Sequence, residues 1–156
     1  MKLWVNLIIA AVLATSLLGA AAVSADSFDC NSVTDVPAAE CQALVALYNS
    51  ADGANWYNNT NWLQTNTVGN WYGVTVAGGH VTHIMLGQNG LLGSIPSELG
   101  SLSNLQMLAL DLNRLSGAIP AELASLSELK YLHISVNALS GGIPPELGSL
   151  SNLQRL

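Results

Sequence analysis

The sequence predicts an α/β solenoid: a right-handed coil with a short parallel sheet on its concave side and a helical cap at its amino-terminal end. Residues 81–156 repeat one motif at a fixed spacing of 24 residues, and such a period is typical of stacked supersecondary units. Residues 26–80 lack the motif and combine a helical pattern with three tryptophans. We interpret them as the cap that every stacked array needs at its end.

The chain begins with a segment that is typical of an export signal. Lys2 precedes an apolar run over Leu7–Leu18, and the small residues at 23–25 suit a signal peptidase. Leu3–Val23 is also about long enough to span a bilayer, but the small residues after the run favour cleavage. We therefore expect removal of residues 1–25, a secreted or cell-surface location, and no membrane span in the mature chain.

The charge balance argues against nucleic acid as a partner. Once the leader is removed, three basic side chains stand against ten acidic ones. Binding to phosphate groups needs a basic surface, which this composition does not provide. An acidic surface mainly favours solubility.

Cys30 and Cys41 are the two cysteines of the sequence. In an exported protein, a pair this close predicts a disulfide. It would close a loop of about a dozen residues and add on the order of 3 kcal/mol by restricting the unfolded chain. The alternative is a pair of metal-binding thiolates, but further Cys or His ligands at suitable spacing are absent from the sequence. We expect no cofactor.

The cap is expected to contain one helix and a pair of strands. Pro37 suits the first turn of a helix, and apolar residues fall on one helical face over Ala38–Tyr48. Gly53 is expected to take a positive φ in the turn that ends this helix. Two short strands, Val74–Val76 and Val81–Leu86, then lead into the repeats.

Three tryptophans of the cap, Trp56, Trp62 and Trp71, lie in a run rich in Asn and Thr. An exposed cluster of this kind could form a sugar-binding platform. A packed cluster would instead cover the open end of the stack, and we favour this second interpretation. Asn58 begins an Asn-x-Thr motif, which is a glycosylation acceptor only in a eukaryotic source.

Each repeat unit begins with alternating apolar residues, which predict a short strand with one face inward. An asparagine follows each strand, at Asn89, Asn113 and Asn137. We expect their side chains to stack into an internal ladder that bonds to the backbone of neighbouring turns. Gly and Pro then turn the chain back, and a Glu-Leu pair opens a short helical turn. Strands of units in register would lie about 4.8 Å apart.

The repeated motif is Leu-x-x-Leu-x-Leu-x-x-Asn-x-Leu-Ser-Gly-x-Ile-Pro-x-Glu-Leu, as in Leu105–Leu123 and, with Ile for one Leu, Leu129–Leu147. It resembles the plant-type leucine-rich repeat. The segment that includes Trp71–Val74 resembles the cap before such repeats. Cysteines flank this element in the plant cap, whereas Gly69 and Val76 hold those places here, which suits a bacterial or algal secreted protein better than a plant receptor.

The resemblance implies a curved solenoid whose concave sheet binds proteins, peptides or glycans. It also implies that the Gly-x-Ile-Pro element builds a second, shorter sheet. The motif on which these expectations rest covers about half of the chain.

The sequence offers no set of residues that predicts catalysis. Glu98, Glu122 and Glu146 should stack roughly 5 Å apart, near the carboxylate separation of retaining glycosidases. Each, however, begins a helical turn, where free N–H groups favour an anion, and an outer column forms no cleft. His83 and His133 would lie on the order of 11 Å apart, too far to share one zinc ion. We expect no catalytic residue and no metal site.

The concave face is the remaining candidate site. Strand residues between the buried leucines must point outward there, which gives a mixed apolar and polar patch of the kind that interfaces use. The expected binding face consists of His83, Met85, Met107, Asp111, Tyr131, His133 and Ser135. The alternative is that three repeats are too few for recognition and that this face is variable surface.

The sequence thus predicts a non-catalytic, secreted or cell-surface binding module that recognises a protein, a peptide or a glycan. Two alternatives remain open: the outer segment of a receptor-like kinase, and an ice-binding or surface-adhesion protein that uses regular columns of outer serines. Because a fourth unit opens at Leu153 and stops at Leu156, we also expect the natural protein to be longer.

Overall fold

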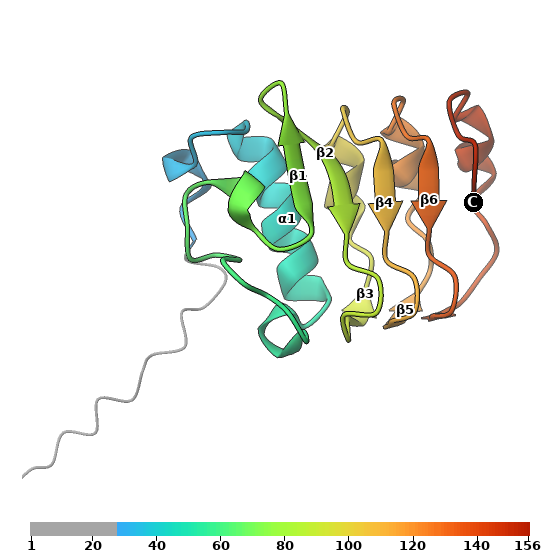
Figure 1. The fold of residues 1–156 in the computed structure, drawn as a ribbon. Helices are drawn as coiled ribbons and strands as arrows, with labels where there is room; N and C mark the ends of the chain where they lie inside the picture. Colours follow the sequence, from blue (N-terminus) through green and yellow to red (C-terminus); the bar gives the residue numbers. More distant parts are fainter. Residues whose placement is uncertain (1–27) are drawn as a thin grey trace, which may run out of the picture.

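The fold is built by repetition of one backbone path. In the computed structural model, which describes residues 28–156, each unit follows a strand, turns at an asparagine and returns through a 3-10 helical turn. The strands of successive units lie side by side in one layer, with the helical turns behind them (Figure 1). The expected signal segment, residues 1–25, lies outside the described residues.

A single α-helix dominates the cap, the segment before the repeats. α1 spans Ala38–Ser50 and follows a short 3-10 turn at Cys30–Ser32. Pro37 stands at the N-cap rather than inside the first turn, where its missing N–H is equally harmless. The expected disulfide is present: Cys30 and Cys41, with Cα atoms 5.6 Å apart, join the 3-10 turn to the start of α1.

The prediction of a positive φ at Gly53 was wrong. The left-handed residue after α1 is Asp52, with a φ of 59°, and Gly53 begins the next 3-10 turn. Gly53 is needed for a different reason, because a Cβ atom there would overlap the ring of Tyr48. Burial raises the pKa of Tyr48 above its ordinary value, and the nearby Asp52 carboxylate raises it further against an opposing hydrogen bond from Asn59.

The three tryptophans of the cap are buried in a single aromatic cluster. Trp62 lies between Trp56 and Trp71, with ring centroids 4.9 Å and 5.0 Å away. Each indole N–H donates to a backbone carbonyl, those of Ala51, Tyr72 and Thr65. These rings therefore form a packed end to the stack and do not present an exposed platform for sugars.

The concave sheet has four strands in the order β1-β2-β4-β6. β1 (Val74–Ala77) pairs antiparallel with β2 (His80–Met85), so both expected strands exist with ends shifted by one residue. β4 (Met107–Ala109) and β6 (Tyr131–His133) then continue parallel to β2. The 24-residue period sets this register, because each residue pairs with the one that stands 24 positions later.

A second, shorter sheet lies along the other edge of the coil (Figure 1). Its strands are β3 (Leu92–Ser94), β5 (Arg114–Gly117) and β7 (Ala138–Leu139), all parallel. The family resemblance implied such a sheet, but its strands are formed mainly by the residues before the Gly-x-Ile-Pro element: β7 ends at Leu139, two residues before Gly141. Gly117 has a φ of 78°, a left-handed conformation that a residue with a side chain adopts only at a cost.

The core is a spine of leucines between the two sheets and the 3-10 turns Ser97–Ser101, Ala121–Ser125 and Pro145–Ser149. Burial at the isoleucine position falls along the stack, from Ile95 at 4% exposed to Ile143 at 60%. The leucines of the spine that are fully buried are Leu86, Leu91, Leu99, Leu102, Leu105, Leu108, Leu110, Leu115, Leu123, Leu126, Leu129 and Leu132.

Asparagine side chains bond each turn to the preceding one. The Oδ1 atom of Asn113 accepts from the N–H groups of Asn89 and Leu91, both at 3.0 Å. Its Nδ2 atom donates to the Leu86 carbonyl at 2.9 Å. Asn137 repeats this pattern one unit later, and Asn89 donates to the carbonyl of Asn58 in the cap. The ladder therefore satisfies buried backbone groups that the strands leave unpaired.

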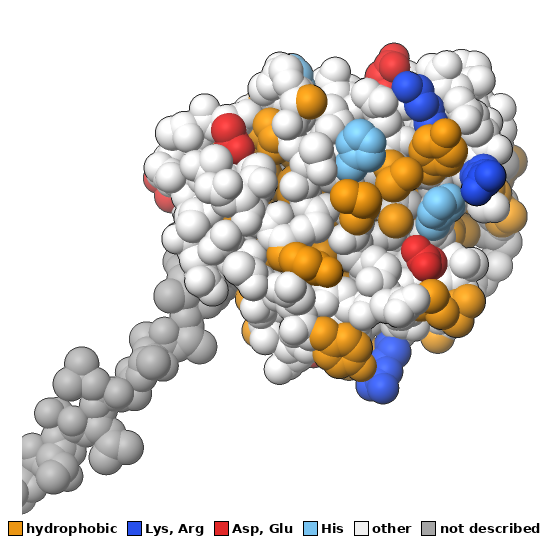
Figure 2. Space-filling model, in the orientation of Figure 1, with side chains coloured by type: hydrophobic (Ala, Val, Ile, Leu, Met, Phe, Trp, Pro, Cys, Tyr) orange, Lys and Arg blue, Asp and Glu red, His pale blue; other side chains and the backbone are white. Residues whose placement is uncertain are grey.

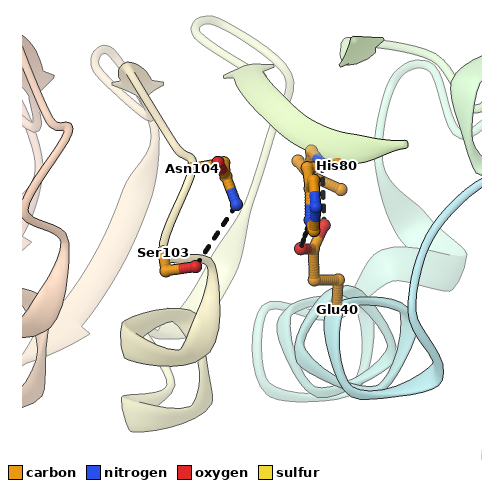
Figure 3. Close-up of polar contacts among 5 residues, drawn as sticks. Glu40, His80, Ser103 and Asn104 are labelled. Atoms are coloured by element: carbon orange, nitrogen blue, oxygen red, sulfur yellow. Dashed lines mark hydrogen bonds and ion pairs between the residues drawn. The ribbon is translucent and has the colours of Figure 1, made fainter. Parts of the chain in front are cut away.

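A buried carboxylate joins α1 to the first strand of the repeats. Glu40 accepts from the Val81 N–H at 2.7 Å, and its other oxygen lies 2.6 Å from Nδ1 of His80 (Figure 3). Glu40 is buried, whereas the side chain of His80 is 40% exposed. Glu40 thus bonds the cap helix directly to the first strand of the repeats.

A candidate binding face on the concave sheet

The parallel strands bring residues from distant parts of the sequence into columns. His83, Met107 and Tyr131 form one column. The next column places Met85 beside Ala109, which in turn pairs with His133. Neighbours within a column stand about 4.8 Å apart, as in any sheet, so the side chains of one column form one continuous strip of surface.

The alternation of a strand explains why these side chains point outward. Ile84, Leu108 and Leu132 are fully buried, so the residues on either side of each must lie on the opposite face. Met85 is accordingly 48% exposed. Figure 2 shows this face, on which hydrophobic and histidine side chains gather over the strands, while blue side chains lie towards its margin.

A third column follows in the turns after the strands and contains Gly87, Asp111 and Ser135. The N–H of Gln88 donates to the Asp111 carbonyl at 3.0 Å, which holds these turns in the same register as the strands. A Cβ atom on Gly87 would lie 3.0 Å from Oδ1 of Asp111. The absence of a side chain at Gly87 therefore leaves room for the Asp111 carboxylate to lean across the column.

The ends of the columns are held by hydrogen bonds between side chains. The hydroxyl group of Tyr131 donates to Oε1 of Gln154 at 3.1 Å. The Tyr131 ring also lies 6.2 Å from the ring of His133. At the other side of the face, Nδ1 of His83 and Oγ1 of Thr82 are 3.0 Å apart. These side chains are thus held in place before any partner binds.

The turns at the rim contain residues whose backbone conformation the sequence analysis did not predict. Gln88, Leu112 and Val136 have φ values of 54–56°, in the left-handed region. Leu112 and Val136 are also exposed and apolar, so they extend the apolar surface of the candidate face beyond the strands. Their repetition at 24 residues was visible in the sequence, but nothing in their residue types indicates a positive φ.

The candidate residues thus divide into two groups. The registered strands bring together His83, Met85, Met107, Tyr131 and His133. Asp111 and Ser135 lie in the following turns, where the Leu112 N–H donates to the Ser135 carbonyl at 3.0 Å. Ala109 completes the second column with a side chain so short that it leaves space between its two larger neighbours.

The column of glutamates is not part of the concave face. Glu98, Glu122 and Glu146 sit in the first turns of the three 3-10 helices and are exposed. Within residues 28–156, no group of three His, Cys, Asp or Glu side chains is placed to hold a metal ion. No helix in that same range combines the length and the hydropathy that a membrane crossing requires.

Comparisons with known proteins identify relatives of this fold. Residues 128–150 match the family model described as Leucine Rich Repeat. The BIR2 ectodomain from Arabidopsis thaliana is 36% identical with a TM-score of 0.64, over 77% of this chain and 65% of that chain. No curated protein matches significantly.

Two further Arabidopsis thaliana structures share the architecture. The leucine-rich repeat ectodomain of the receptor kinase GASSHO1/SCHENGEN3, in complex with CASPARIAN STRIP INTEGRITY FACTOR 2, is 33% identical with a TM-score of 0.63, over 74% of this chain and 14% of that one. The ectodomain of the receptor kinase SOBIR1 is 24% identical with a TM-score of 0.59, over 78% of this chain and 69% of that one. At 24% identity, the similarity to SOBIR1 shows only that the two chains share a fold.

Several independent observations agree on the family. The concave strands pair at the 24-residue period of the sequence, the asparagines of the repeats bond neighbouring turns, and a second parallel sheet accompanies the first. The repeat model and the receptor ectodomains match the same architecture. Residues 128–150 are a leucine-rich repeat, and the chain has the architecture of plant-type leucine-rich repeat ectodomains.

Proposed function

We propose that this chain is a non-catalytic binding module that recognises a protein or peptide through its concave face. The observation that carries this proposal is the register of the concave sheet. It aligns His83, Met107 and Tyr131 in one column and Met85 and His133 in the next, above a layer of buried leucines that cannot shift without opening the core.

The composition of the face favours a protein or peptide over a small polar ligand. Tyr and Met are enriched at protein interfaces, and charged side chains are depleted at interface centres. Met85 and Met107 have flexible side chains that adapt to the shape of a partner. Tyr131, held by Gln154, provides a rigid aromatic group of the type that often dominates binding energy.

The relatives support the same class of partner and an extracellular location. BIR2 and GASSHO1/SCHENGEN3 were both solved as ectodomains, the latter in complex with CASPARIAN STRIP INTEGRITY FACTOR 2. The Cys30–Cys41 disulfide suits an oxidising compartment. We therefore propose that the protein acts outside the cell, where its partner is a secreted or surface-exposed protein or peptide.

A peptide-display selection tests this function. The immobilised chain is screened against a random peptide library, and each selected peptide is measured against Met107→Ala and Tyr131→Ala. We expect each substitution to weaken binding at least tenfold, as at an interface hot spot. The matched control Gln64→Ala lies in the cap and should leave the affinity unchanged.

Two results would contradict the proposal. Peptides that keep their full affinity for both concave-face variants would place recognition elsewhere. A library that yields no specific peptide, together with a glycan whose binding is abolished by Met107→Ala and Tyr131→Ala, would show that the partner of the concave face belongs to a different chemical class.

A second candidate is the ectodomain of a membrane receptor. It is favoured by the 36% identity to the BIR2 ectodomain. Sequencing the transcript beyond the codon for Leu156 tests it, because a receptor requires a membrane-spanning segment there. An in-frame stop codon with no such segment would reject this candidate and leave the binding module as proposed.

A further inference from the structure

A hollow of about 420 Å³ lies on the convex side of the molecule, away from the concave sheet. It is bounded by residues 28–31, by the outer face of α1, and by the 3-10 turn Ser97–Ser101 of the first repeat. Figure 1 shows α1 behind the sheet, so this hollow does not share the concave face. Its volume falls within the range of roughly 300–1,000 Å³ that is usual for small-molecule sites.

One face of α1 forms the floor. Gln42, Val45, Ala46 and Asn49 line the hollow, and their spacing places them along one side of a helix. The two central side chains are aliphatic, and the two outer ones carry amides. The floor is therefore an apolar strip with the amide of Gln42 at one end.

The walls are held in place by the rest of the cap. The Cys30–Cys41 disulfide ties the first wall to α1. Phe28, in the same wall, packs edge-on against the buried Trp71 with ring centroids 5.4 Å apart. A site whose walls are already fixed loses less entropy when it binds a ligand.

Several hydrogen-bonding atoms of the lining are open to a ligand. Asp29 Oδ1 accepts from the N–H and the Nδ2 of Asn31, at 2.9 Å and 3.0 Å, which leaves Asp29 Oδ2 available. Glu98 accepts only a long bond of 3.4 Å from the Ser97 hydroxyl. The Gln42 side chain is exposed and has no hydrogen-bond partner among the described residues, so both its donor and its acceptor are open.

This set of groups selects the chemistry of the ligand. Among residues 28–156, none of the side chains that line the hollow is basic, and Asp29 and Glu98 would repel an anion. A cation would bind the carboxylates but would gain nothing from the NH₂ group of Gln42 or from the apolar strip of Val45 and Ala46. A neutral polyhydroxyl compound satisfies both kinds of group, because each hydroxyl donates and accepts. Its C–H faces suit the strip of Val45 and Ala46.

We propose that this hollow binds a neutral saccharide of one or two rings. The site is independent of the concave face: its residues come from the cap and from one helical turn, and none belongs to β2, β4 or β6. The protein would thus hold a sugar on its convex side while its concave sheet remains free.

Amide NMR of the ¹⁵N-labelled chain, purified with its disulfide intact, tests the proposal. Cellobiose, maltose, lactose and diacetylchitobiose are titrated separately to tens of millimolar, with spermidine as a cationic probe. At least one disaccharide should shift the amide signals of Asn31 and Gln42, and leave those of β4 unchanged. Spermidine should leave them unchanged.

Matched variants locate the effect. Gln42→Ala should weaken binding of that disaccharide about tenfold, the loss expected for hydrogen bonds of the Gln42 amide. Ala is a good helix former, so this variant keeps α1 intact. Gln64→Ala removes an equally exposed amide outside the hollow and should bind like the wild type.

Four outcomes would overturn the proposal. These are no shift with any disaccharide, shifts with spermidine alone, equal affinity of wild type and Gln42→Ala, or equal weakening by Gln64→Ala. None of them bears on the concave face, whose failure would appear in the peptide measurements instead.

Discussion

Val136 has a conformation that its side chain disfavours. Its φ of 54° lies in the left-handed region, where a β-branched residue is a genuine outlier. Gln88 and Leu112 take the same conformation in the preceding units, at 54° and 56°. The stacking of the units thus determines the turn geometry. The residues at these three positions adopt it despite their own conformational preferences.

Replacement of Val136 by Asn should therefore stabilise the protein. Asn accepts the left-handed conformation at little cost, and the side chain of Val136 is 66% exposed, so little packing is lost. We expect the free energy of unfolding to rise by about 1 kcal/mol, measured by urea denaturation. Val136→Thr keeps the β-branch and should show no gain. Equal stability of the Asn and Thr variants would contradict this explanation.

Asn113 is the most connected member of the ladder. It accepts from the N–H groups of Asn89 and Leu91 and donates to the carbonyl of Leu86. Asn113→Ala should lower the free energy of unfolding by about 3 kcal/mol, because a buried group left without a partner costs about 1–3 kcal/mol. Chemical denaturation of wild type and variant measures this loss.

Asn104 offers a matched control for Asn113. Its amide makes a single bond of 3.3 Å to the hydroxyl of Ser103 near the surface (Figure 3). Asn104→Ala should therefore change stability by no more than about 0.5 kcal/mol. If the two variants lost the same stability, the ladder would have no special role.

At the scale of elements, Glu40 fixes how the cap helix meets the sheet. Glu40→Ala leaves the buried Val81 N–H without its acceptor. We expect a loss of about 2 kcal/mol in unfolding free energy. Little of it should come from the ion pair, because water screens the half-exposed His80. His80→Ala should accordingly cost less than Glu40→Ala, and the reverse order would contradict this assignment.

The cap also retains the geometry for a second disulfide. A Cβ atom at Gly69 would lie 3.5 Å from Cβ of Val76, within the spacing of about 3.5–4.5 Å that a disulfide needs. Paired cysteines at Gly69 and Val76 should oxidise and add about 2 kcal/mol. The measurement is thermal unfolding with and without reductant. Free thiols that persist in the oxidised variant would contradict the expectation.

Across the whole molecule, the sequence predicted what the repeat specifies. The period placed Leu105, Leu108 and Leu110 in the core and aligned His83 with Met107, because identical units can stack only in one register. The helix, the strands to within a residue, and the Cys30–Cys41 disulfide were also predicted correctly.

Features that depend on contacts between distant segments could not be predicted from the sequence. The bond of Glu40 to Val81 spans 41 positions and leaves no local pattern. The hollow between α1 and the turn at Glu98 exists only once cap and repeat have packed. The left-handed residue after α1 was assigned to Gly53, because glycine adopts this conformation most readily, but the structure places it one residue earlier, at Asp52.

The central claim is that the stacked leucine coil presents its concave sheet for recognition. Hydrogen–deuterium exchange of the chain, with and without a peptide selected by display, tests it most directly. The account predicts slower exchange in His80–Met85, Met107–Ala109 and Tyr131–His133 when the peptide is bound. Protection confined to the second sheet, at Leu92–Ser94 and Arg114–Gly117, would contradict it.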